Sequence, residues 1–165
     1  MMNYEQVLKY AMQMELDGSN FFREKASIFS NPTTERLFIT LAETEMEHYH
    51  YLKRQLDQYV KNETFDLSEA VLDREEDIFK AREESEHINE TLKESDIPDL
   101  TILRMAYLIE KDYKEFYLNA AESAENEGIK KIFTKLSKWE EGHENLFKAE
   151  YDRRMKEYMS VPWGG

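Results

Sequence analysis

The chain has 165 residues, the length of one domain with a sizeable core. It contains no cysteine, which excludes disulfides, thiolate zinc sites and iron–sulfur clusters, and its net charge of -13 argues against binding to a nucleic-acid backbone. No apolar run approaches the roughly 20 residues of a membrane helix, and the N-terminus lacks the basic and apolar regions of a signal peptide. We therefore expect a cytoplasmic protein that binds neither a membrane nor nucleic acid.

Two helices are predicted in the first part of the chain. Asn3, followed three residues later by Gln6, predicts a helix that begins there and runs to about Phe29. Asn31-Pro32 predicts the start of a second helix, which ends near Asn62. One face of each helix is apolar except for a few charged positions. These faces carry Leu8, Ala11, Glu15, Gly18 and Phe22, and then Phe38, Leu41, Glu45, His48 and Leu52.

A long crossover, residues 63–99, separates these helices from two more. A weak apolar stripe within it predicts a surface helix at about residues 75–94. Ile97-Pro98 begins the third helix, and Gly128 separates it from the fourth, as a glycine just past a helix end does. Their apolar faces carry Leu103, Ala106, Glu110, Tyr113 and Tyr117, and then Phe133, Leu136, Glu140, His143 and Phe147.

The two halves of the chain repeat one another. Adding 95 to positions 15, 45 and 48 gives 110, 140 and 143, and each sum carries the same residue type as its partner. The chain therefore contains two copies of a helical hairpin, each with one Glu and one Glu-x-x-His. We predict an all-α protein in which the two duplicated hairpins form a four-helix bundle with one long crossover. Residues 1–160 make up this domain, and residues 161–165 are a tail.

Helical register separates these pairs from other Glu-x-x-His pairs in the chain. Glu47/His50 and Glu84/His87 lie on stripes that are polar throughout, so we expect both pairs to face solvent. The stripes through Glu15, Glu45/His48, Glu110 and Glu140/His143 are apolar above and below. A straight helix that buries those apolar residues carries its Glu and His inward as well.

Four carboxylates buried near one another need compensation, by protonation, by pairing with Lys or Arg, or by binding cations. The six stripes contain no Lys or Arg, whereas two divalent metals would balance the four glutamates. Spacing of i, i+3 lets a Glu and its His reach one ion. The alternative is that these are chance acids at a rotated helix interface. Nearby aromatic residues are expected in the core, although Tyr113 and Tyr117 could each hydrogen-bond a metal ligand or act as a redox relay, and are therefore candidate catalytic residues.

The order Glu, Glu-x-x-His, Glu, Glu-x-x-His resembles the ferritin-like di-iron carboxylate superfamily over residues 4–155, apart from the crossover. The runs from Glu15 to Phe22 and from Glu110 to Tyr117 are similar to the rubrerythrin branch. This resemblance implies that Glu45 and Glu140 bridge or flank two metal ions. It makes Glu15 and Glu110 terminal ligands, and it gives one histidine, His48 or His143, to each metal.

Two features depart from rubrerythrins proper. The chain has no rubredoxin domain with Cys-x-x-Cys pairs. Rubrerythrins proper also carry an extra glutamate on the third helix, but here the residue three positions after Glu110 is Tyr113. The six-residue set is closer to the symmetric site of bacterioferritin-like proteins.

The resemblance implies a site of two iron ions that reduces O2 or hydrogen peroxide with electrons from a separate donor protein, in a homodimer. A carboxylate-rich site with one histidine per metal favours iron or manganese over zinc. Three other functions stay open: a ferroxidase centre for iron storage or detoxification, a manganese catalase-like enzyme, and a metal-free helical interaction module.

Overall fold

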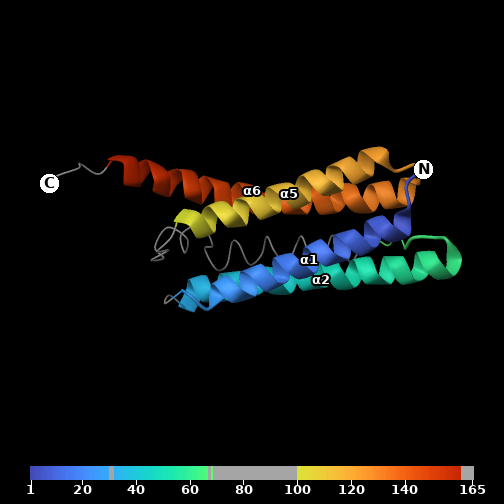
Figure 1. Cartoon of the computed structure of the whole chain (residues 1–165), viewed down its shortest axis with the longest axis horizontal. Helices are drawn as coiled ribbons and strands as arrows, with labels where there is room; N and C mark the ends of the chain where they lie inside the picture. Colours follow the sequence, from blue (N-terminus) through green and yellow to red (C-terminus); the bar gives the residue numbers. More distant parts are fainter. Residues whose placement is uncertain (30–31, 67, 69–99, 161–165) are drawn as a thin grey trace.

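The structure is a computed structural model that describes residues 1–29, 32–66, 68 and 100–160. Within these residues it contains the helices α1 (Tyr4–Ala26), α2 (Pro32–Asn62), α5 (Leu100–Ser123) and α6 (Glu127–Ser160). Helices α1 and α2 form one antiparallel hairpin, and α5 and α6 form the other (Figure 1). The described residues are thus an all-α four-helix bundle, as predicted. The helix expected at about residues 75–94 and the tail at 161–165 lie outside them.

The first helix begins where the sequence predicts and ends three residues early. The Asn3 side chain accepts a hydrogen bond from the backbone N–H of Gln6 at 3.1 Å, which caps α1. At the other end, the N–H groups of Ile28 and Phe29 donate to carbonyls three residues back instead of four. These tighter bonds close the chain into a turn, so α1 ends at Ala26 and not at Phe29.

Gly128 does not end the third helix, contrary to the prediction. Helix α5 ends at Ser123, and Gly128 lies in the first turn of α6. The Asn126 side chain accepts hydrogen bonds from the N–H groups of Gly128 at 2.8 Å and Ile129 at 3.2 Å. Asn126 therefore acts as the N-terminal cap of α6, and this cap sets the boundary.

The predicted repeat is visible as a matched contact within each hairpin. The Ser19 hydroxyl of α1 donates to the Ala42 carbonyl of α2 at 2.8 Å, and the Ser137 hydroxyl of α6 donates to the Lys114 carbonyl of α5 at 3.0 Å. Positions 19 and 114 are 95 residues apart, and so are 42 and 137. The two hairpins therefore align their helices in the same register, with the hydroxyl on opposite members of the pair.

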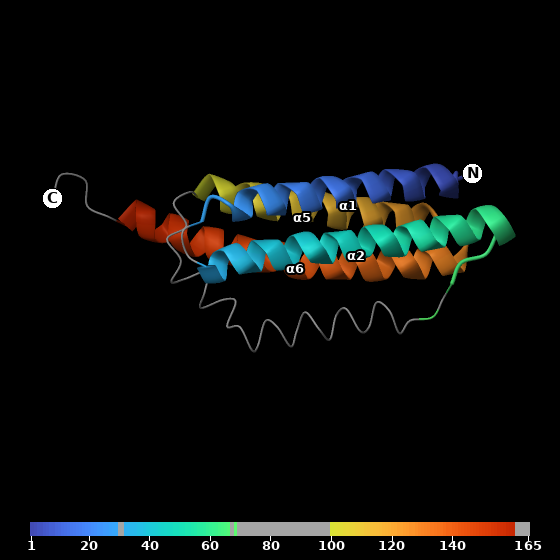
Figure 2. The same cartoon turned by 90° about the horizontal axis from the view of Figure 1, so that it is seen from below.

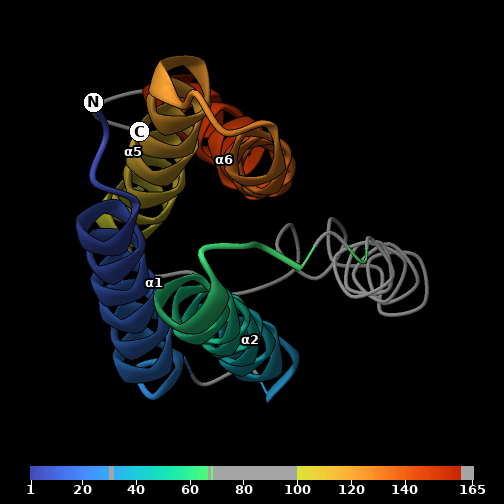
Figure 3. The same cartoon turned by 90° about the vertical axis from the view of Figure 1, so that its right-hand side faces the viewer.

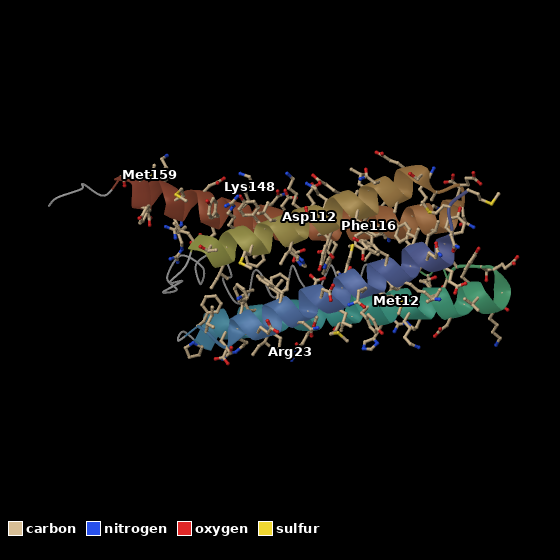
Figure 4. All side chains as sticks on the ribbon, viewed as in Figure 1. Met12, Arg23, Asp112, Phe116, Lys148 and Met159 are labelled. Atoms are coloured by element: carbon tan, nitrogen blue, oxygen red, sulfur yellow. The ribbon has the colours of Figure 1, made fainter. Side chains whose placement is uncertain are left out.

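The hairpins pack with α1 beside α5 and α2 beside α6 (Figures 2 and 3). Phe116 of α5 lies on the side that faces α1, where its ring centroid is 5.0 Å from that of Tyr10 (Figure 4). In the described part of the chain, no helix combines the length and the apolar character needed to cross a membrane.

Two apolar clusters fill the bundle, one toward each end. Residues of the first cluster come before Glu15 in α1 and before Glu140 in α6, and after His48 in α2 and Glu110 in α5. Residues of the second cluster come after Glu15 and Glu140, and before His48 and Glu110. The middle layer between the clusters therefore contains the charged residues. Large members of the first cluster are Leu8, Leu52, Tyr117, Phe133 and Leu136, and those of the second are Phe22, Phe38, Leu103 and Phe147.

Candidate metal centre

Each helix of the bundle brings a glutamate into the middle layer, and α2 and α6 each add a histidine one turn further on. The side chains are withdrawn from solvent, with an exposed fraction of 0% for five of them and 1% for His143. The structure therefore brings together every residue that the sequence places in the site. The six are Glu15, Glu45, His48, Glu110, Glu140 and His143.

The six side chains form two overlapping groups that could each hold a metal ion. Glu15 and His48 belong to one group, Glu110 and His143 belong to the other, and Glu45 and Glu140 belong to both. Within each group, one potential ligand atom per residue lies within 4.8 Å of all the others. Neighbouring ions could therefore share the two central carboxylates.

The histidines face carboxylates from both hairpins. His48 Nδ1 lies 3.5 Å from Glu15 Oε2 and 3.3 Å from Glu140 Oε1. His143 Nδ1 lies 3.6 Å from Glu110 Oε1 and 3.8 Å from Glu45 Oε1. Each group thus combines one hairpin's terminal Glu and His with a central glutamate of the other hairpin, so neither hairpin holds a complete group alone.

The carboxylates are buried without the hydrogen bonds that buried charges require. Both side-chain oxygens of Glu45, Glu110 and Glu140, and Oε2 of Glu15, receive no hydrogen bond from the described part of the chain. Leaving buried carboxylate oxygens unsatisfied costs several kcal/mol per group. Divalent cations would satisfy these oxygens, and the donor set of carboxylates and imidazoles suits iron or manganese. The residues present therefore fit a pair of metal ions.

The electrostatics of the metal-free site show the same need for positive charge. Burial, with Glu140 and Glu15 nearby, raises the pKa of Glu45, and burial with Glu140 and Glu45 nearby raises the pKa of Glu110. Burial would lower the pKa of His48, but the carboxylates around it, Glu15 foremost, raise it above its ordinary value. The site therefore retains protons when it lacks metal.

Glu140 behaves differently from the other central carboxylate. Burial alone would raise its pKa, but contacts with Glu110, His143 and His48 together hold that pKa well below its usual range. The Glu140 carboxylate thus stays ionised between the two histidines, where a cation bound by either ligand group would contact it.

Both candidate tyrosines of α5 reach across to α1. The buried Tyr117 hydroxyl donates to Glu15 Oε1, and the half-buried Tyr113 hydroxyl donates to the Met14 carbonyl at 2.5 Å. Burial and the surrounding carboxylates, Glu15 foremost among them, raise the pKa of Tyr117, so its phenol keeps its proton and acts as a donor. Tyr117 therefore contacts a site residue directly, whereas Tyr113 holds the backbone next to it.

Trp139, which was not among the residues predicted for the site, lies against both histidines. Its ring is T-shaped to the rings of His48 and His143, with centroids 5.7 Å apart in each pair. Trp139 stands four residues before His143, so helical spacing places both side chains on one face of α6. That spacing was the available signal. His50 is exposed, as its polar stripe predicts, and His87 lies outside the described residues.

The family model described as Rubrerythrin matches residues 6–151, which include all six residues of the site. No curated protein and no solved structure matches the chain.

Proposed function

This chain belongs to the rubrerythrin family, and on that premise we propose that it is a di-iron oxidoreductase that reduces O2 or hydrogen peroxide with electrons from an external donor. The observation that carries the proposal is the pair of buried ligand groups that share Glu45 and Glu140. Family membership agrees with the ferritin-like character of the bundle. It also makes a dinuclear site the natural use of these carboxylates.

In the proposed site, each residue has a role that follows from its group. Glu45 and Glu140 are common to both groups, so they would bridge or flank the two ions. Glu15 and His48 would complete one metal position, and Glu110 and His143 the other. Two Fe²⁺ ions would balance the four negative charges, with manganese as the alternative and zinc less suited to a carboxylate-rich set.

Held by these six residues, two ferrous ions would supply the two electrons that, with two protons, reduce one hydrogen peroxide to two waters. The chain's own residues set the conditions for that reaction. The apolar clusters on either side separate the middle layer from bulk water. The buried histidines and carboxylates already lie close together in the metal-free protein, which lowers the cost of reorganisation when ions bind. The 165 residues contain no cysteine, so no thiolate-bound centre within them could act as the electron donor.

The proposal is tested by the stoichiometry of oxidation. The protein is loaded without oxygen to two Fe²⁺ per chain, and hydrogen peroxide is added in steps while ferric absorbance is followed. We expect complete oxidation at one peroxide per two irons, faster than for Fe²⁺ in buffer. A rate equal to that of free iron would contradict the proposal.

A second candidate is a ferroxidase centre for iron storage or detoxification, and one observation favours it. Rubrerythrins proper carry an additional glutamate in this part of the third helix, whereas this chain has Tyr113. The Tyr113 hydroxyl donates a hydrogen bond to the Met14 carbonyl and adds no carboxylate to the site. Gel filtration after iron loading separates the candidates. A storage protein would elute at an apparent mass far above that of the expected homodimer and would hold many irons per chain. Oxygen release from peroxide without a donor would instead identify a manganese catalase-like enzyme.

A further inference from the structure

The two metal positions differ in what surrounds their terminal glutamates. Position 22 is equivalent to position 117 in the repeat, but it carries Phe where the other carries Tyr. The Tyr117 hydroxyl donates to Glu15 Oε1, which leaves Oε2 of that carboxylate toward His48, 3.5 Å away. Phe22 has no hydroxyl to offer Glu110, and both Glu110 oxygens receive no hydrogen bond from the described residues.

A second pair of equivalent positions increases the difference. Position 18 carries Gly and position 113 carries Tyr. A Cβ atom on Gly18 would lie 3.0 Å from Cε2 of Tyr113, so the absence of a side chain makes room for that ring. The Tyr113 hydroxyl donates to the carbonyl of Met14, the residue before Glu15. Helix α5 thus holds both the backbone and the side chain at Glu15, and α1 offers no matching hydroxyl at Glu110.

We propose that the Glu15–His48 position binds a divalent cation more tightly than the Glu110–His143 position, and that Tyr117 is the positioning residue responsible. This inference rests on the proposed dinuclear site. A hydrogen bond from outside the ligand set fixes the orientation of a metal-binding carboxylate, and losing such a partner typically lowers metal affinity about 10- to 100-fold. Glu110, which lacks that partner, must be ordered when its cation binds. The Glu110–His143 position therefore binds its cation second and releases it first.

The test begins with calorimetric titration of the metal-free full-length chain with Co²⁺ alone. We expect two resolved binding steps whose affinities differ by about 10- to 100-fold. His48→Ala should remove the tighter step and leave the weaker one. His143→Ala should remove the weaker step and leave the tighter one. The reverse assignment would overturn the inference.

Moving one hydroxyl then tests the role of Tyr117. Tyr117→Phe should weaken the tighter step about 10- to 100-fold, so that the two steps merge. Phe22→Tyr should strengthen the weaker step, because the repeat places its hydroxyl near Glu110. Tyr10→Phe removes a hydroxyl from an exposed tyrosine and serves as the matched control that leaves both steps unchanged. Circular dichroism establishes that each variant folds. If Phe22→Tyr does not fold, Tyr117→Phe still decides the question.

The outcomes separate this inference from the proposed function. A wild-type chain that binds no Co²⁺ would defeat both. Two equal steps, or unequal steps that Tyr117→Phe leaves unchanged, would overturn the inference and leave the dinuclear site standing.

Discussion

At the scale of single residues, Glu140 is one of the two glutamates that belong to both ligand groups, and it lies close to both histidines. We expect Glu140→Ala to lower iron from two ions per chain to one or none after anaerobic loading. Its neighbour Glu141 is exposed, so Glu141→Ala removes the same charge from the solvent face and should retain both ions. Metal analysis of the desalted proteins provides the measurement. Two irons per chain in Glu140→Ala would contradict the assignment.

The raised pKa values of Glu45, Glu110 and His48 predict how the metal-free protein responds to pH. A group with a raised pKa binds more protons in the native than in the unfolded state, so the unfolding free energy falls as pH rises. For the glutamates the loss begins above their ordinary pKa of 4.5. The lowered pKa of Glu140 affects stability only below that value, so it does not oppose this trend.

Urea unfolding of the metal-free chain at about pH 5.5 and pH 8 measures the effect. We expect lower stability at the higher pH. With excess Mn²⁺ the order should reverse, because metal ligands must lose their protons to bind. Metal-free stability that stays constant or rises over this range would contradict the raised pKa values of these groups.

At the scale of helices, Gly18 and Gly142, which both lie inside helices, offer a matched comparison. Replacing Gly by Ala inside a helix typically stabilises by up to about 1 kcal/mol. A Cβ on Gly142 meets nothing within 4 Å, whereas one on Gly18 lies 3.0 Å from Tyr113. We therefore expect Gly142→Ala to raise the unfolding free energy of the metal-free protein. The change in unfolding free energy for Gly18→Ala should show a shortfall of about 1 kcal/mol or more relative to Gly142→Ala.

Thermal and urea unfolding of both variants test this packing argument. In a Tyr113→Ala background the shortfall of Gly18→Ala should disappear, since the ring that it meets has gone. A shortfall that persists would mean that Gly18 is needed for another reason.

The helix register and the repeat predict the convergence of the six site residues. A helix that buries Phe38 and Leu41 has to turn Glu45 inward, and the second hairpin repeats this pattern. The targets of Tyr113 and Tyr117 do not follow from periodicity, because they depend on how α1 and α5 are spaced and rotated across the hairpin interface. Helix ends were also harder to predict. The sequence around Gly128 contains two boundary signals, and the Asn126 cap prevails over the glycine.

At the scale of the whole molecule, the proposed function makes the stability of the bundle depend on whether metal is bound in the middle layer. The unmet buried oxygens destabilise the metal-free native state. Cations that bind only the native state stabilise it, by about 4 kcal/mol per site when free metal exceeds Kd a thousandfold. We expect the unfolding midpoint to rise markedly on addition of Fe²⁺ without oxygen. Equal midpoints with and without iron would count against a native metal site.

The division of each ligand group between the two hairpins has a consequence for how such a site can vary. A half-length chain could assemble this centre only by pairing with an identical copy of itself, and any substitution would then appear on both sides at once. Joining the halves in one polypeptide removes that restriction. Phenylalanine can stand at 22 while tyrosine stands at 117, so the two sides are free to specialise independently.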